Sequence, residues 1–161
     1  MSIRAGHAGF VDSGVLEGED LVLWRKFLRW SQGIHAAVNK AVAVAADLSV
    51  SEFEVLTRLW SHPEQALPQL ELATELNWSA SRASHLLNRL EQRSFVSRED
   101  AGQGRARIVR LTEEGHRQLM KAFDAHGRAF RSMLLDRLTM DQRATLLAIM
   151  DSHREPADHA N

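Results

Sequence analysis

The 161-residue chain contains no cysteine. Without thiols it can form no disulfide framework, thiolate zinc cage, iron–sulfur cluster or catalytic thiol, so these classes of site are excluded. It also lacks any run of about eighteen apolar residues, the length that a membrane-spanning helix needs. The N-terminal residues show neither the positively charged start nor the apolar stretch of a secretion signal, and we therefore expect a cytoplasmic protein.

The overall charge is close to zero, but the charges are distributed unevenly. With 44% apolar and 25% charged residues, the composition suits one globular domain. Residues 1–78 carry six Lys and Arg against ten Asp and Glu (net −4), residues 79–112 seven against three (+4), and residues 113–161 seven against eight (−1). All seven cations of the middle segment are arginine, whose planar fork suits phosphates and guanine edges. That segment is a candidate nucleic-acid contact; arginines scattered over a solvated surface are the alternative.

The N-terminal part predicts an arm followed by a long helix. Residues 1–18 contain four of the nine glycines and predict a flexible arm, and residues 19–161 predict a single domain. From Leu21 to Leu48 apolar residues recur at alternating steps of three and four, which is typical of a helix. At about 28 residues this helix would extend about 42 Å. A compact domain of this size needs less, so we expect part of it to contact a second subunit.

Three shorter helices follow. Ser51 and Glu54 predict a capping box at the start of the first, and Pro63 ends it. The second begins near Pro68, and the third is capped by Ser79 or Ser81. Only Asn77 and Trp78 separate these two, so the sequence predicts a helix-turn-helix.

From Phe95 the apolar period becomes two. Residues 95–98 and 108–111 predict a β-hairpin around a glycine-containing turn. Thr112 predicts the cap of a long helix that runs to about residue 137, and Thr139 with Gln142 predicts a capping box before a last helix. The fold class is thus mainly α with a small β-hairpin wing.

The order helix, turn, helix and arginine-bearing hairpin favours duplex DNA as the partner. In such an arrangement one helix enters the major groove and the wing reaches the neighbouring minor groove. The exposed face predicted for the second helix of the pair carries hydrogen-bonding and basic side chains with no acid to repel phosphate. These residues are Ser79, Ser81, Arg82, Ser84, His85, Asn88 and Arg89.

At this level of detail the chain resembles the MarR family of winged helix-turn-helix transcriptional regulators over residues 20–152. The stretch SASRASHLLNRLEQRSFVSRE is similar to the family's recognition helix and first wing strand, and GRARIVRLTEEG to its second wing strand and next helix. LSVSEFEVLTRL and LPQLELATELNWS resemble the two preceding helices. The resemblance implies a homodimer that binds a pseudopalindromic operator, acts as a repressor and is released by a small-molecule effector.

The same resemblance implies two lobes. Helices at about 20–48 and 113–152 would form the dimerisation lobe, and residues 51–112 the winged helix-turn-helix lobe. In the wing, Arg105 matches the family's minor-groove arginine, but Gln103 stands where the family has an aspartate, and Asp100 is a substitute acid. Ser94 replaces the glycine that commonly follows the recognition helix.

Individual roles follow from these positions. Arg82 and His85 lie one turn apart and are expected to contact a base or a phosphate, while Ser79 or Ser81 binds phosphate. Arg105 is the expected wing contact, and Arg107 is expected to follow the DNA backbone. Arg89 either binds phosphate or braces the wing. In the bracing role its partner would be Glu91, Glu99 or Asp100.

The family's effector cleft lies between its two lobes. The resemblance implies that a small phenolic or aromatic effector would bind there, although a simple core role is the alternative for the tryptophans. The residues that could line the cleft are Trp30, Ile34, His35, Phe53, Trp60 and Phe123.

Other functions are less well supported by the residues. The eight histidines show no HExxH and no pair at i and i+4, so we expect no metal, although a zinc-responsive member of the family remains an alternative through His35, His116 or His126. No GxSxG elbow or phosphate-binding GxxxxGK[ST] occurs, and we expect no enzyme and no cofactor. A dimeric scaffold for protein contacts is the second alternative.

Overall fold

The computed structural model describes residues 15–100 and 107–152. The chain divides into two compact units, residues 1–33 and 34–161. Helix α1 (Gly18–Ala46) is the predicted long helix, and in the first unit the rings of Trp24 and Phe27 stack with centroids 6.3 Å apart. Most of the predicted arm, residues 1–14, lies outside the described residues. Across the described ranges, none of the helices combines the length and hydropathy that a membrane span requires.

Helix α2 (Val50–Ser61) begins two residues earlier than the sequence predicted. Ser49 is its N-cap: the Ser49 hydroxyl accepts from the Glu52 backbone N–H, and the Glu52 carboxylate accepts from the Ser49 N–H at 2.8 Å. The predicted capping box of Ser51 and Glu54 is therefore wrong. Both pairs have the required spacing, but Glu52 is the one that is buried and paired with Arg89 and Arg93, so the helix begins where Glu52 occupies the third position.

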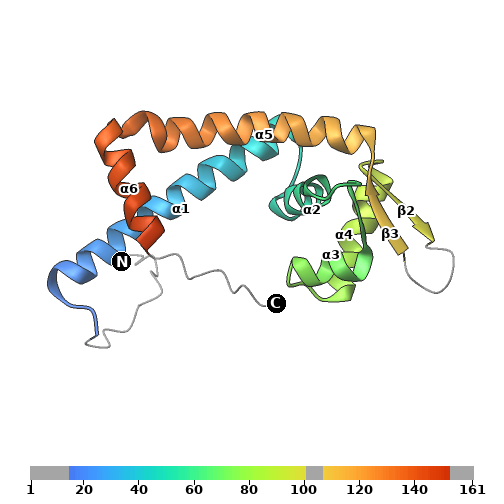
Figure 1. Cartoon of the computed structure of the whole chain (residues 1–161), viewed down its shortest axis with the longest axis horizontal. Helices are drawn as coiled ribbons and strands as arrows, with labels where there is room; N and C mark the ends of the chain where they lie inside the picture. Colours follow the sequence, from blue (N-terminus) through green and yellow to red (C-terminus); the bar gives the residue numbers. More distant parts are fainter. Residues whose placement is uncertain (1–14, 101–106, 153–161) are drawn as a thin grey trace, which may run out of the picture. The chain divides into compact units, whose positions relative to one another are not determined.

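The helix-turn-helix consists of α3 (Gln69–Glu75) and α4 (Ala80–Gln92). Ser79 caps α4 by accepting from the Arg82 backbone N–H at 3.3 Å, as one of the two predicted caps. Figure 1 shows α4 leading into the strands β2 (Val96–Asp100) and β3 (Arg107–Leu111), which form the predicted hairpin. The structure thus has the mainly helical fold with a β-wing that the sequence predicted.

A third strand, β1 (Ala66–Pro68), was not predicted. It pairs antiparallel with β3, Leu67 opposite Val109, and gives the sheet order β1–β3–β2. On its other side β3 pairs with β2, Arg98 opposite Val109. Three residues are too few to show a period of two, and Pro68 is tolerated because β1 is an edge strand.

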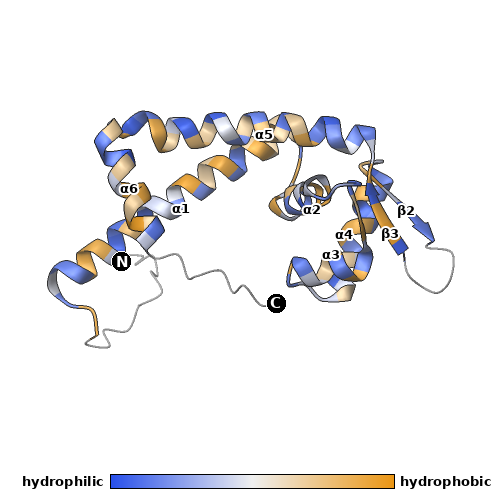
Figure 2. Cartoon of the chain, viewed as in Figure 1, coloured by the Kyte–Doolittle hydropathy of each residue, from blue (hydrophilic) through white to orange (hydrophobic). Residues whose placement is uncertain are grey.

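Helix α5 (Glu113–Met133) is capped by Thr112 as predicted, and a short 3-10 turn, η1 (Leu135–Arg137), ends the segment. Helix α6 (Met140–Ser152) opens with the predicted Thr139–Gln142 capping box, in which each residue accepts from the other's backbone N–H. Figure 2 shows orange hydrophobic residues interspersed with blue ones along α1, α5 and α6. Among the described residues of α6 none is buried.

One hydrophobic core joins the C-terminal part of α1, helices α2, α3 and α4, the sheet and α5. Helix α2 packs against α5, and α3 against α4, so the core fixes the position of α4. The side chains that are most completely buried in it are Leu48, Val55, Leu56, Leu59, Leu72, Leu87, Leu90, Val109 and Leu119.

The junction after α4 depends on close backbone packing. Ser94 adopts a left-handed conformation, with φ of 59°, in the position where the family commonly has glycine, and its carbonyl accepts from the Thr112 hydroxyl at 2.6 Å. Gly115, in the first turn of α5, lies directly against the carbonyl of Phe95. A Cβ atom at Gly115 would overlap that oxygen, so this position requires glycine.

We expect Gly115→Ala to lower the free energy of unfolding by about 2 kcal/mol, because the added methyl must displace the Phe95 backbone. Gly127→Ala is the matched control in the same helix, since a Cβ there meets no atom within 4 Å. That change should raise the free energy of unfolding by about 0.5–1 kcal/mol. Urea unfolding of both variants measures the contrast, and equal effects would contradict the close contact.

Candidate nucleic-acid interface

Helix α4 has two sharply different faces. Ala83, Leu86, Leu87 and Leu90 are buried in the core. Most of the predicted contact residues lie on the opposite side: Ser84 is half-buried, and Ser79, Ser81, Arg82, His85, Asn88 and Arg89 are exposed. No acid occurs between residues 79 and 90, so this surface can meet a polyanion without like-charge repulsion.

Arg82 lies against the neighbouring elements. Its guanidinium stands 4.1 Å above the ring of Trp78, and its Nη2 donates to the hydroxyl of Ser51 at 3.4 Å. Trp78 is half-buried at the turn between α3 and α4, where it packs against the core. A cation–π contact and one hydrogen bond therefore direct Arg82 toward the first turn of α2.

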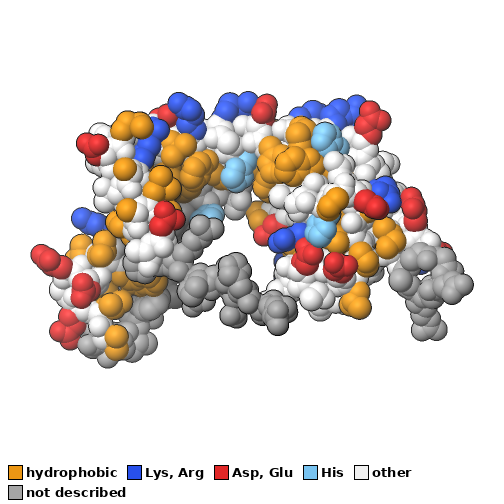
Figure 3. Space-filling model, viewed as in Figure 1, with side chains coloured by type: hydrophobic (Ala, Val, Ile, Leu, Met, Phe, Trp, Pro, Cys, Tyr) orange, Lys and Arg blue, Asp and Glu red, His pale blue; other side chains and the backbone are white. Residues whose placement is uncertain are grey.

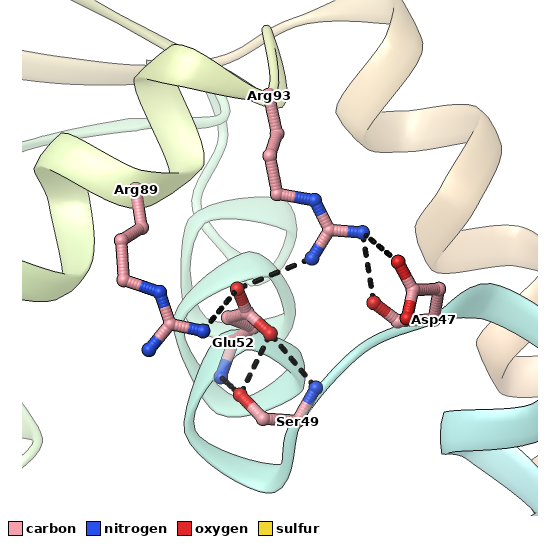
Figure 4. A network of polar contacts seen from close by, with 5 residues as sticks. All are labelled: Asp47, Ser49, Glu52, Arg89 and Arg93. Carbon is pink, nitrogen blue, oxygen red and sulfur yellow. Dashed lines mark hydrogen bonds and ion pairs between the residues drawn. The ribbon is translucent and has the colours of Figure 1, made fainter.

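Arg89 belongs to a network centred on the carboxylate of Glu52, which is only 2% exposed. Arg89 Nη2 donates to Glu52 Oε1 at 3.3 Å, and Arg93 Nη1 donates to the same oxygen at 3.2 Å. Figure 4 shows Glu52 between the two arginines, with Asp47 on the far side of Arg93. Arg93 also donates to the Asp47 carboxylate and carbonyl, each at 2.8 Å.

The predicted bracing partners of Arg89, which were Glu91, Glu99 and Asp100, are wrong. Arg89 instead ties α4 to α2 through Glu52. The reason is packing: α4 lies against α2, which brings the buried carboxylate of Glu52 within reach, whereas Glu91 is bound by another arginine.

The environment of Glu52 favours its ionised form. Burial raises the pKa of Glu52, but hydrogen bonds from the Ser49 backbone and hydroxyl and the charges of Arg93 and Arg89 outweigh it. The pKa consequently lies below the ordinary value of 4.5. Glu52 therefore holds α4 as a charged group at neutral pH.

A second arginine ties the wing to α4. The side chain of Arg98, on β2, pairs with the carboxylate of Glu91, and its Nη2 donates to Asn88 Oδ1 at 2.7 Å. The hydrogen bond and charge of Arg98 lower the pKa of Glu91. Asn88, an exposed residue and a predicted DNA contact, thus has its amide oxygen engaged by the wing, which leaves its NH₂ group as a donor.

The wing is described only in its two strands. Arg107, at the start of β3, lies exposed with its Nε 3.8 Å from Asp100 Oδ1. Asp100 therefore pairs with Arg107. Gln103 and Arg105, the predicted tip residues, lie outside the described residues.

Comparisons with known proteins agree with this geometry. Residues 48–102 match the model of the MarR family. Sco3205, a MarR family transcriptional regulator from Streptomyces coelicolor solved in complex with DNA, is 29% identical, with 85% of this chain and 86% of that chain covered and a TM-score of 0.71. AbsC, a MarR family regulator from the same organism, is 24% identical over 85% and 93% of the two chains, also with a TM-score of 0.71. No curated protein sequence matches significantly.

Residues 48–102 form a MarR-family domain, and the chain has the fold of MarR-family transcriptional regulators. Members of the MarR family are transcriptional regulators and not enzymes, in agreement with the expectation from the sequence that this chain is not an enzyme. The organohalide-sensing regulator RdhR-CbdbA1625 in its 2,4-dichlorophenol-bound form has the same fold, at 16% identity over 93% of this chain and 87% of that chain, with a TM-score of 0.66.

Three of the predicted effector residues come together in this MarR-family fold. Phe123 on α5 makes edge-on contacts with Phe53 and Trp60 of α2, with centroid distances of 5.5 and 5.3 Å. The ring of His126 stacks on Phe53 at 5.7 Å. Of the other three, Ile34 is half-buried and His35 exposed on α1, and Trp30 belongs to the first unit.

The zinc alternative has no support in the described part of the chain. Within residues 15–100 and 107–152 no three His, Cys, Asp or Glu side chains are grouped so as to hold a metal ion.

The residues of this surface that were not predicted from the sequence are Glu52, Arg93, Asp47 and Arg98. Ser49 and Glu52 also have capping-box spacing, so the local signal for Glu52 was present. Arg93 and Asp47 are 46 residues apart and meet only because α4 packs beside the start of α2. No pattern along the chain indicates such a pair.

We expect Glu52→Gln to lower the free energy of unfolding at neutral pH by about 2 kcal/mol, because two arginines lose their shared charge-assisted partner. Since the folded pKa of Glu52 is depressed, its contribution is present above the unfolded pKa and is lost as pH falls through the folded pKa. The difference between variant and wild type should therefore shrink toward acid. Urea unfolding at a series of pH values measures it.

Glu54→Gln is the control, because Glu54 is an exposed neighbour on the same helix. It should change the free energy of unfolding by less than about 0.5 kcal/mol at every pH. A pH-independent loss in Glu52→Gln would show that packing, and not ionisation, explains its role.

Proposed function

We propose that the chain is a sequence-specific DNA-binding transcriptional regulator of the MarR family that acts as a repressor. The observation that carries this proposal is the acid-free face of α4, which presents arginine, histidine, asparagine and serine side chains and continues into a basic wing. Helix α4 would enter a major groove and the β2–β3 wing the adjacent minor groove. The DNA complex of Sco3205 supports this, and a regulator that binds DNA would act in the cytoplasm.

The regulator would bind DNA as a homodimer. Leu23 and Phe27 on α1 are 68% and 51% exposed, and Leu147 and Met150 on α6 are 61% and 55% exposed. Figure 3 shows orange hydrophobic side chains open on the visible face of α6. Each of these two helices thus exposes large apolar side chains to water, and a second copy of the chain would cover them.

A small aromatic effector would bind at the cluster of Phe53, Trp60 and Phe123. Trp60 is 42% exposed, so the cluster is open to a ligand. Phe53 also lines a hollow of about 550 Å³ beside Trp78, between α2 and α3. The 2,4-dichlorophenol-bound form of RdhR-CbdbA1625 supports an aromatic ligand. Because Phe53 follows Glu52 on α2, a ligand bound at Phe53 would act on the helix that holds α4. The ligand would release the protein from DNA if it bound the DNA-free protein more tightly than the DNA-bound protein.

Selection of the purified protein against a randomised duplex pool at near-physiological salt tests the proposal. We expect the bound fraction to be enriched in an inverted repeat whose half-sites lie about 34–36 Å apart, one helical turn, because two α4 helices would enter successive major grooves. Asn88→Ala should relax the preference at defined positions of the repeat, because an exposed asparagine amide can hydrogen-bond to a base edge. Enrichment of no sequence, with bulk binding alone, would contradict a sequence-specific regulator.

Sedimentation tests the dimer. We expect the wild type to remain dimeric at nanomolar concentration, and Leu147→Glu to shift it toward monomer by placing a charge in the apolar contact. Leu70→Glu is the matched control, since Leu70 is 72% exposed on α3, outside the proposed dimerisation helices. A monomeric wild type would overturn the dimeric arrangement.

A further inference from the structure

A hollow of about 390 Å³ separates the start of α2 from α4. Ser49 and Ser51 line it on the α2 side and Arg82, His85, Leu86 and Arg89 on the α4 side, and Trp78 is the remaining lining residue. One water molecule takes up roughly 30 Å³ in the liquid, so the hollow has room for a polyatomic anion. No carboxylate side chain is among the residues that line it.

The arginine and histidine side chains of α4 that line the hollow lie together because of their spacing along the helix. Arg82, His85 and Arg89 are separated by three and four residues, which places them along one face of the helix. All three are exposed. Their guanidinium and imidazole groups are hydrogen-bond donors suited to phosphate oxygens.

Arg82 is directed across this hollow. Its stacking on Trp78 and its bond to Ser51 hold the guanidinium beside α2. A bidentate contact with guanine would require Arg82 to leave both partners, whereas an anion in the hollow can be bound where the guanidinium already lies. The Ser51 hydroxyl, which accepts from Arg82, has its own proton to donate to the same anion.

Arg89 can turn to the anion without leaving a buried charge unpaired. It is 63% exposed and has a single hydrogen bond to Glu52. Glu52 would keep Arg93 at 3.2 Å and both groups of Ser49, so its charge stays compensated when Arg89 moves. Arg93, 29% exposed and also bound to Asp47, is the fixed partner.

We propose that this hollow is a phosphate seat, formed by Ser51, Arg82, His85 and Arg89, that binds one phosphate group of the DNA backbone in each half-site. The inference rests on the proposed DNA-binding function and deepens it. In this arrangement Arg82 contributes to the affinity for DNA and to the position of the protein along the duplex, whereas other residues of α4 recognise the bases. It also adds Ser51 of α2 to the contact surface.

The test uses the duplex obtained by selection and a scrambled duplex of equal length. Arg82→Ala should weaken binding to both by a similar factor, about tenfold, and lower the slope of log affinity against log salt by about one. Arg58→Ala is the matched control, since Arg58 is paired with Glu75 at 3.4 Å outside the hollow, and it should bind like the wild type. A loss confined to one base pair, with the salt slope unchanged, would overturn the seat.

Neutral methylphosphonate linkages, placed one at a time in the selected duplex, locate the phosphate. One position per half-site should weaken wild-type binding about tenfold yet leave Arg82→Ala unaffected, and Ser51→Ala should show a reduced effect at that same position. If every position weakens wild type and Arg82→Ala equally, the proposal is wrong.

Inorganic phosphate separates failure of the seat from failure of the proposed function. If the wild type bound no duplex, the DNA-binding function would fail, but the seat is still tested by titrating phosphate and following the His85 ring signals by NMR. If the His85 signals shift saturably with phosphate in the wild type but not in Arg82→Ala, the hollow binds free phosphate as proposed. Their absence would overturn it.

Discussion

The ion pair between Glu52 and Arg93 is the constraint on which the DNA-facing surface depends. A carboxylate that is 2% exposed at the start of α2 must be compensated, and Arg93, at the end of α4, provides that charge at 3.2 Å. The same guanidinium binds Asp47 at the end of α1. One side chain thus joins the end of α4 to residues 41 and 46 positions earlier in the chain, at the start of α2 and the end of α1.

In this arrangement Arg89 is not required to compensate the charge of Glu52. Because Arg93 and Ser49 already satisfy Glu52, Arg89 is held loosely and stays at the surface. Arg98 plays the corresponding role for the wing, where it fixes Glu91 and orients Asn88. Glu52 and Glu91, the acids closest to the basic surface, are therefore neutralised by ion pairs with Arg93 and Arg98. Their charges are compensated, so they do not oppose the positive potential on the face of α4.

Sequence patterns predicted the elements well because each element carries its own signal. The apolar period of α1, the caps at Ser79 and Thr112 and the alternation of the hairpin are local features. Strand β1 was missed because three residues carry no period, and the α2 cap was misplaced because two pairs have capping-box spacing. Partners such as Arg93 and Asp47 depend on tertiary packing, so the direction of each arginine could not be predicted, although the face of α4 that bears Arg82 and Arg89 could.

A pair of double-mutant cycles on the free energy of unfolding tests this account most directly. Glu52→Gln is combined in turn with Arg93→Gln and with Arg89→Gln, and each coupling energy is measured by urea unfolding at neutral pH. The account predicts coupling of about 1 kcal/mol or more for Glu52 with Arg93, and clearly less for Glu52 with the exposed Arg89. Additive effects at Arg93, or stronger coupling to Arg89, would contradict it.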